Sequence, residues 1–239
     1  MDEAQILLGE LDYYHVIQPI IEMNTNQVFG YEMLLRSKTI PNPELLFRHA
    51  KEQNQQLELD LHSIERAFQT INHSNDWFGD LHIFINILPS TIGNPTAVKQ
   101  IKAWRDTLKL ASDKIVFEIT EDKKEEELIM CKNMIGNMKK QGFLIAVDDL
   151  GKGDSTLAYA IELTPHVVKL DRAFARDLAN SSNKQKEIEA LVHFFDHDTI
   201  LILEGIETEA DLQAAKKAGI RYVQGYYLGR PQPLQHYRN

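Results

Sequence analysis

The stretch Ile115–Asp149, IVFEITEDKKEEELIMCKNMIGNMKKQGFLIAVDD, decides the fold because it holds one complete strand–helix–strand unit. Apolar and branched residues predict a strand over Ile115–Ile119 and a helix over Glu125–Lys140. Gly142 ends that helix, and Phe143–Val147 follows as a second strand. A helix between two strands of one sheet makes the strands parallel, with a right-handed crossover.

The same alternation continues on both sides of this unit. Further strands are predicted at Leu81–Ile87, Val167–Leu170, Ile200–Leu203 and Tyr222–Gln224, and further helices at Glu44–Gln53, Leu57–Ile71, Thr96–Leu108, Ser155–Leu163, Lys184–Phe195 and Glu209–Ala218. Near the start, Tyr13–Ile21 and Val28–Leu35 are strand-like and only a short turn separates them, which predicts an antiparallel hairpin. The pattern indicates an α/β barrel in one domain over residues 1–239.

Oxygen-bearing side chains recur at the ends of these predicted strands. They are Glu32, Asn86, Glu118, Asp148, Asp149 and Glu204, with Lys169 in the same layer. A barrel brings the carboxyl ends of its parallel strands to one rim, so these side chains are expected to meet there. Carboxylate and amide oxygens are hard ligands that suit Mg²⁺ or Mn²⁺. Adjacent Asp148 and Asp149 repel each other unless a cation lies between them.

Composition narrows the classes of function. The chain has 239 residues and a formal net charge of −9, which argues against duplex nucleic acid or an anionic membrane as a partner. It starts without the basic and apolar regions of a signal peptide, and no apolar run is long enough to cross a bilayer. We therefore expect a soluble, cytoplasmic protein. The zinc motif H-E-x-x-H is absent, as are a Walker loop and a G-x-S-x-G turn.

The strand-end residues lie in segments that together resemble the EAL domain, a family of cyclic di-GMP phosphodiesterases. The resemblance rests on QPI at 18–20, GYEMLLR at 30–36, FEITE at 117–121, DDLGKG at 148–153, KLD at 169–171, EGIET at 204–208 and QGY at 224–226. These matches occur in the order of the family and fall within a motif-bearing core at residues 13–234.

The resemblance implies a modified TIM (β/α)8 barrel whose first strand runs antiparallel to the rest, in agreement with the predicted hairpin. It also implies two divalent cations, Mg²⁺ or Mn²⁺. One would be held by Glu32, Asn86, Glu118 and Asp148, and the other by Asp148, Asp149 and Glu204. Lys169, Glu204 and Glu32 would be catalytic, and Gln18, Leu35, Arg36, Asp171, Glu207 and Gln224 would bind the nucleotide or support its site.

The activity implied by the resemblance is hydrolysis of cyclic di-GMP to linear 5′-pGpG by water activated between two metal ions, in a homodimer. The sequence departs from the family pattern at Met33 and at three positions of one loop, Leu150, Lys152 and Asp154. Glu121, which resembles the residue that anchors this loop, is present, and we expect Lys152 to pair with Glu121 or Asp154. Two alternatives stay open: a domain that binds cyclic di-GMP without cutting it, which the altered loop supports, and a module that only binds other proteins, against which Arg36 and the strand-end carboxylates speak.

Overall fold

The computed structural model describes residues 12–119, 125–151, 156–195 and 199–238. The strands are β1 (Tyr13–Glu22), β2 (Gln27–Ser37), β3 (His82–Ile87), β4 (Ile115–Ile119), β5 (Leu144–Leu150), β6 (Val167–Leu170), β7 (Ile200–Leu203) and β8 (Tyr222–Gln224). The helices are α1 (Pro43–Glu52), α2 (Gln56–His73), α3 (Asn75–Phe78), α4 (Pro89–Ile92), α5 (Pro95–Arg105), α6 (Glu125–Lys140), α7 (Thr156–Leu163), α8 (Arg172–Ala175), α9 (Ser182–Phe194) and α10 (Glu209–Lys217).

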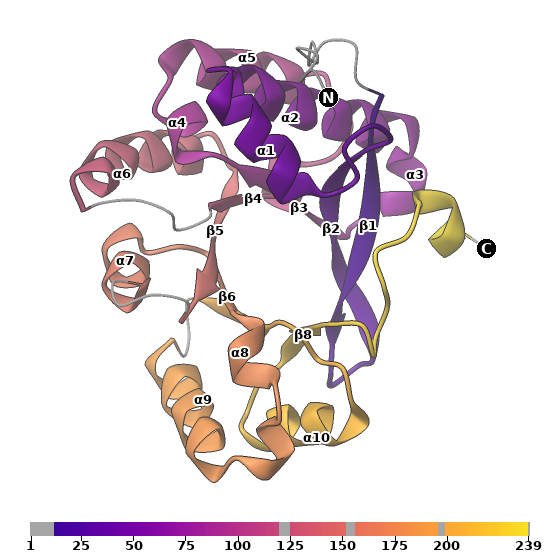
Figure 1. The fold of residues 1–239 in the computed structure, drawn as a ribbon, viewed down its shortest axis with the longest axis vertical. Helices are drawn as coiled ribbons and strands as arrows, with labels where there is room; N and C mark the ends of the chain where they lie inside the picture. The colour runs from indigo at the N-terminus through magenta and orange to yellow at the C-terminus, as the bar shows by residue number, and fades with distance from the viewer. Residues whose placement is uncertain (1–11, 120–124, 152–155, 196–198, 239) are drawn as a thin grey trace, which may run out of the picture.

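The strands close into a barrel in the order β1 to β8, and the helices lie outside it (Figure 1). β1 pairs antiparallel with both of its neighbours, β2 and β8. Every pair from β2–β3 to β7–β8 is parallel. This arrangement confirms the predicted barrel with its antiparallel first strand. Parallel strands follow one another because each is joined to the next by a helical crossover.

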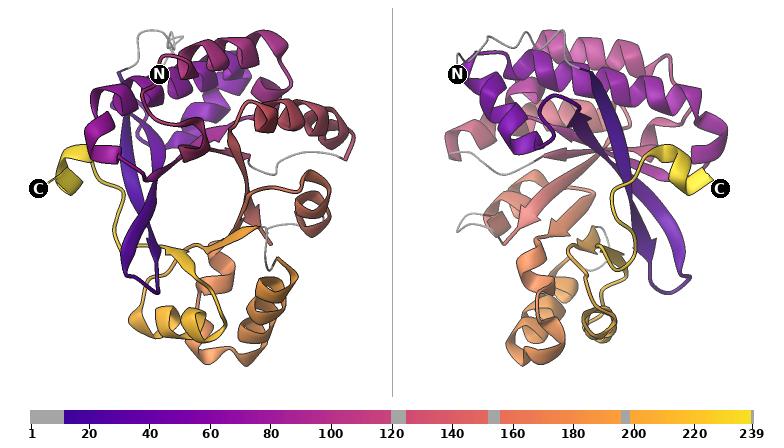
Figure 2. Two further views of the ribbon diagram at one scale, coloured as in Figure 1. Left: turned by 180° about the vertical axis from the view of Figure 1, so that it is seen from behind. Right: turned by 45° about the vertical axis from the view of Figure 1, so that its right-hand side comes forward.

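The β1–β2 ribbon is covered differently from the other strands. A turn joins β1 directly to β2, so this connection supplies no crossover helix. The chain after β8 returns along β1, where Ile17 and Gln232 exchange two backbone hydrogen bonds of 2.8 and 3.0 Å. Tyr237, in the 3₁₀ helix Leu234–Arg238, then packs against Tyr31 on β2, with ring centroids 5.4 Å apart. Figure 2 shows this C-terminal segment lying across the ribbon.

Asparagine side chains set the start of two outer helices. Asn42 accepts hydrogen bonds from the backbone N–H groups of residues 44 and 45, and Asn94 does the same for residues 96 and 97. A proline follows each asparagine at the first helical position, where no backbone N–H is needed. Both helices lie outside the barrel and bury one face, with Leu46 and Ala50 of α1 and Ala97 and Ile101 of α5 buried.

Towards the amino ends of the parallel strands, the barrel interior is filled with apolar side chains. Ile20, Phe84, Val116, Ala146, Val167 and Ile202 form one buried cluster, with Phe29, Leu144, Ile200 and Tyr222 packed against it. This layer, here called the apolar plug, fills the barrel at its level, so the barrel has a packed core and is not a pore. Any polar site inside must therefore lie above this plug, towards the carboxyl ends of the parallel strands. Within the described residues, no helix has the length and apolar composition that crossing a bilayer requires.

His15 is a half-buried titratable group on β1 that faces α2. Its Nε2 lies 3.3 Å from the Ser63 hydroxyl, and burial lowers the pKa of His15 to about 3, with the charges of Arg66 and Arg36 adding to the effect. An unfolded histidine has a pKa near 6.5, so the unfolded chain takes up a proton below that pH and the folded chain does not. Folding stability from this group is therefore present above pH 6.5 and is lost progressively as the pH falls towards 3.

We predict that the free energy of unfolding of the wild type falls by about 2 kcal/mol more than that of His15→Gln between pH 7 and pH 5, because only the wild type carries this histidine. Urea unfolding at the two pH values measures both quantities. Equal losses in the two proteins would show that His15 is protonated in the folded state.

Candidate active site

A layer of polar side chains lies directly above the apolar plug, and strand alternation puts it there. Side chains two residues apart on a strand point to the same face. On each of the parallel strands β3 to β8, one residue of the plug is followed two positions later by a polar one, as in Val116 and Glu118 or Ala146 and Asp148. The full set of such pairs is Phe84–Asn86, Val116–Glu118, Ala146–Asp148, Val167–Lys169, Ile202–Glu204 and Tyr222–Gln224. The barrel therefore gathers the predicted residues at one level.

Lys169 lies at the centre of this layer. Its side chain is 1% exposed, and its Nζ contacts carboxylate oxygens from four different strands or strand ends. The distances are 2.7 Å to Glu204, 2.8 Å to Glu118, and 3.4 Å to both Glu32 and Asp148. Because one ammonium touches all four, these carboxylates lie close enough together to share a small cation.

Glu32 is held by amide side chains as well. Gln224 Nε2 donates to Glu32 Oε2 at 2.7 Å, and Asn86 Nδ2 donates to Glu32 Oε1 at 3.3 Å. Gln18 accepts from Gln224 at 3.3 Å and donates to the Gly229 carbonyl at 3.0 Å. The two glutamines thus tie β1, β8 and the segment after β8 to the acidic site on β2.

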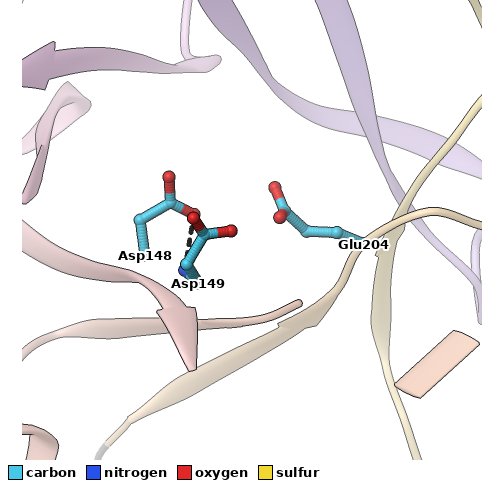
Figure 3. Close-up of side chains that lie close together, drawn as sticks. All are labelled: Asp148, Asp149 and Glu204. Atoms are coloured by element: carbon cyan, nitrogen blue, oxygen red, sulfur yellow. Dashed lines mark hydrogen bonds between the residues drawn. The ribbon is translucent and has the colours of Figure 1, made fainter. Parts of the chain in front are cut away.

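A second group of acids lies at the ends of β5 and β7 (Figure 3). Ligand oxygens of Asp148, Asp149 and Glu204 all lie within 4.8 Å of one another. Adjacent residues of a regular strand point to opposite faces, but here the β5–β6 register shifts after Val147 and Asp149 has a left-handed φ of 59°. This irregularity brings both aspartates to the same side. Asp148 accepts the Asp149 backbone N–H at 3.0 Å, which fixes the turn.

The pKa values show how poorly the acids are compensated. Burial raises the pKa of Glu118 well above its ordinary value, the charge of Glu32 adds to the rise, and Lys169 opposes it. Burial raises the pKa of Glu204 to about 8 although Lys169 lowers it, and burial also raises the pKa of Asp148.

Two groups of the site remain charged in spite of burial. Burial opposes ionisation of Glu32, but Lys169 and the hydrogen bonds from Gln224 and Asn86 outweigh it and leave the pKa of Glu32 lowered. Burial opposes the charge of Lys169 too, and the surrounding carboxylates outweigh it, so the pKa of Lys169 is raised well above its ordinary value.

The donor set fits divalent cations. Five carboxylates, those of Glu32, Glu118, Asp148, Asp149 and Glu204, face one ammonium. Both oxygens of Glu118 are buried; Oε1 contacts Lys169 Nζ at 2.8 Å, whereas Oε2 receives no hydrogen bond from a described donor. A buried carboxylate oxygen without a donor is costly, and a metal ion would relieve that cost. Two divalent cations and Lys169 would together carry five positive charges, which equals the charge of the five ionised acids.

The position of Glu32 differs from the expectation. The sequence places it at a strand end, whereas it lies near the middle of β2, opposite Gln18 on β1. The reason is that β2 continues to Ser37 in its ribbon with β1, and this ribbon forms a lip above the polar layer.

The residues predicted to bind the nucleotide are less uniform in their placement. Arg36 lies on that lip, half-buried, and donates to the Leu35 carbonyl at 2.8 Å. The Leu35 side chain packs in a cluster with Leu46 and Leu59 of the outer helices, so it points away from the barrel interior. Asp171 caps α8 by accepting the Ala173 N–H at 2.8 Å, and Glu207 is exposed in the β7–α10 connection.

The altered loop is described only at its start. Leu150 ends β5 and is buried in a cluster with Val168 and Leu170, so it fills an apolar position. Gly151 has φ 101°, and a Cβ there would lie 2.2 Å from the Phe174 ring, so the turn requires glycine. Glu121, Lys152 and Asp154, and the ion pair expected among them, lie outside the described residues.

Aromatic residues near the mouth were not predicted from the sequence. Tyr14 is 38% exposed and pairs directly with Arg36 across the β1–β2 ribbon. Tyr226, just after β8, is also exposed, and the Arg230 guanidinium lies over its ring at 4.4 Å from the centroid. Alternation along the first predicted strand would have put residue 14 on the face of Gln18, but nothing in the sequence alone pairs Tyr226 with Arg230.

Comparison with known proteins matches residues 5–231 to the EAL domain. Among curated relatives, the cyclic di-GMP phosphodiesterase PdeB of Shewanella oneidensis is 30% identical over 183 residues, which is 75% of this chain and 21% of PdeB. The cyclic di-GMP phosphodiesterase PdeF of Escherichia coli is 25% identical over 98% of this chain and 32% of PdeF. The chain thus spans only a minor part of the length of these relatives.

Solved structures agree in fold. An EAL domain protein from Listeria monocytogenes has a TM-score of 0.87 and 26% identity, covering 100% of this chain and 97% of its own. BlrP1 of Klebsiella pneumoniae, in a complex with calcium and cyclic di-GMP, has a TM-score of 0.83 and 28% identity, covering 95% of this chain and 57% of its own. With a family match over nearly all of its length, a barrel of the same topology and the acidic layer in place, the chain belongs to the EAL domain family.

Proposed function

We propose that this domain hydrolyses cyclic di-GMP to linear 5′-pGpG in the cytoplasm. The observation that carries the proposal is the layer of five carboxylates and one ammonium above the barrel plug. The names of PdeB and PdeF, and the cyclic di-GMP complex of BlrP1, support the choice of substrate. The negative charge of the layer disfavours a phosphodiester unless cations are bound, so the same acids imply a metal-dependent reaction.

The residues divide into two groups of ligands for Mg²⁺ or Mn²⁺. Glu32, Asn86, Glu118 and Asp148 would hold one cation, and Asp148, Asp149 and Glu204 the other. When bound, such a pair of cations lowers the pKa of water and offsets charge on a phosphodiester. The supporting geometry is the convergence of the three carboxylates of the first group on Lys169 Nζ, the 3.3 Å bond from Asn86 to Glu32, and the 4.8 Å grouping of the second group.

The chain's own groups then orient and deprotonate the attacking water. Lys169 is fixed by four carboxylates and would donate a hydrogen bond to the water oxygen. Glu204, 2.7 Å from Lys169 Nζ, would accept the proton. The water oxygen forms a bond to phosphorus, the bond to the ribose 3′-oxygen breaks, and that oxygen takes a proton to give a 3′-hydroxyl.

Substrate binding would use the lip formed by β1 and β2 and the end of β6. Arg36 would pair with a phosphate, and Gln18, Gln224, Leu35, Asp171 and Glu207 would complete or support the nucleotide site. Since the Leu35 side chain is turned outwards and Asp171 caps a helix, their contribution would come from the backbone and from the position of α8.

We predict that Glu118→Gln lowers the rate of pGpG formation at least about a hundredfold, because it removes a charged ligand without changing side-chain volume. The matched control is Glu189→Gln, which removes an exposed carboxylate on α9 and should leave the rate unchanged. Chromatography of cyclic di-GMP incubated with protein and Mn²⁺ measures both.

Two results would contradict the enzyme. Binding of cyclic di-GMP to the wild type without any product would establish the alternative of a receptor, which the altered loop keeps open. Failure to bind the nucleotide at all would leave a protein-interaction module.

The contribution of Lys169 to folding stability should be largest when no divalent ion is bound. Removing one partner of a buried ion pair typically costs about 3–5 kcal/mol, so we predict a loss of that order for Lys169→Met in the presence of EDTA. Adding Mn²⁺ should restore much of this loss because the cation replaces the missing charge. Thermal unfolding with and without Mn²⁺ provides the measurement.

The matched control for that variant is Lys132→Met, since Lys132 forms an exposed ion pair with Glu162 and exposed pairs contribute little. If Lys169→Met proved as stable as wild type in EDTA, the buried acids would have to be neutral and the charge argument would fail.

We further propose that the protein is a homodimer that associates through α7. Leu157 and Ile161, one turn apart on this helix, are 42% and 51% exposed. Their helix follows β5, which carries Asp148 and Asp149, so association there would lie next to the candidate second cation.

We predict that the double substitution Leu157→Glu and Ile161→Glu converts a dimer to a monomer in light scattering after size exclusion, because charge is excluded from the core of an interface. Phe194→Glu is the matched control: this side chain is 54% exposed but lies on α9. Loss of the dimer in the control as well, or a wild type that is already monomeric, would refute association through α7.

A further inference from the structure

Asp60 is a buried acid that the proposed chemistry does not use. It lies on α2, which packs outside the barrel against β3, and it is 2% exposed. Its Oδ2 accepts the backbone N–H of Leu88 at 2.9 Å, a contact between segments 28 residues apart. Burial raises the pKa of Asp60 to about 6, and the hydrogen bond from the Leu88 N–H opposes this rise.

The hydrogen bond from the Leu88 N–H to Asp60 lies just after the part of β3 that is paired with a strand on one side only. Leu88 directly follows β3 and lies two residues after Asn86. The β2–β3 ladder ends at Ile85, although the β3–β4 ladder continues to Ile87. The backbone of Asn86 is therefore paired with β4 but lies beyond the last residue pair of the β2–β3 ladder. The Asn86 side chain bridges this opening through its 3.3 Å hydrogen bond to Glu32.

We propose that Asp60 is a positioning residue for the metal ligand Asn86. By holding the Leu88 N–H, it fixes the turn from β3 into α4 and so keeps the Asn86 amide at the level of Glu32 and Glu118. This inference rests on the proposed function, because it assumes that Asn86 is a ligand. It adds that the ligand set is supported from outside the barrel, through a helix that contributes no ligand itself.

A purely structural role makes a different prediction. Losing a buried acceptor costs stability wherever it occurs, by leaving an N–H without a partner. Asp211 provides the comparison, since it is 8% exposed and its Oδ1 accepts the Ala179 N–H at 2.9 Å. It makes the same kind of bond between α10 and a distant segment, but none to the turn that follows Asn86. Only the positioning role links such a bond to metal affinity.

The experiment compares Mn²⁺ binding, with the metal alone as the probe, in the wild type, Asp60→Ala, Asp60→Asn and Asp211→Ala. Paramagnetic resonance of free Mn²⁺ gives the dissociation constants, and urea unfolding in EDTA gives the stabilities. We expect Asp60→Ala to lower the affinity for the Mn²⁺ that Asn86 would bind by about 10–100-fold, the range for residues that support a metal ligand. Asp60→Asn, which keeps an acceptor oxygen, should restore most of the affinity, and Asp211→Ala should lose stability without losing affinity.

A double-mutant cycle with Asn86→Ala tests the route. If Asp60 acts through Asn86, Asp60→Ala should weaken Mn²⁺ binding much less in the Asn86→Ala background than in the wild type. Should Asp60→Ala be too unstable to purify, Asp60→Ser replaces it, since a hydroxyl there is too short to reach Leu88.

Wild-type affinity in Asp60→Ala or its replacement, or equal weakening in Asp211→Ala, would overturn the positioning role and leave the proposed function standing. A wild type that does not bind Mn²⁺ would overturn both.

Discussion

The contact between Lys169 and four buried carboxylates is the constraint on which the site depends. An ammonium that is 1% exposed is stable only because acids from β2, β4, β5 and β7 surround it. The acids carry more negative charge than this one ammonium can offset. Burial and the neighbouring carboxylates therefore raise the pKa of Glu118 and Asp148 in spite of Lys169. The polar layer is therefore held together by one ammonium and keeps an excess of negative charge that further cations would neutralise.

Barrel geometry explains how such a layer is built from scattered residues. Each of the strands β3 to β8 contributes an apolar side chain to the plug and, two residues later, a polar side chain to the layer above it. The plug supplies a low-dielectric floor, which strengthens every charge interaction above it. The exception is Asp149, which reaches the layer through a left-handed turn and a register shift, the kind of local strain that concentrates at functional sites.

Much of this could be predicted from the sequence, because periodicity and strand-end chemistry are local signals. The hairpin, the alternating strands and the convergence of Asn86, Glu118 and Asp148 all follow from spacing. What could not be predicted depends on contacts between distant segments. The pairing of Gln18 with Glu32, the outward turn of Leu35 and the return of Gln232 along β1 are set by the ribbon and by the packing of the outer helices. The bond from Asp60 to Leu88 has no signal in either segment alone.

The central claim is that the acids around Lys169 hold two divalent cations, and crystals grown with Mn²⁺ and measured at the manganese absorption edge test it most directly. The account predicts two anomalous peaks, one bounded by Glu32, Asn86, Glu118 and Asp148, and one by Asp148, Asp149 and Glu204. Crystals at saturating Mn²⁺ with no peak in this layer, and with Lys169 still in contact with all four carboxylates, would contradict it.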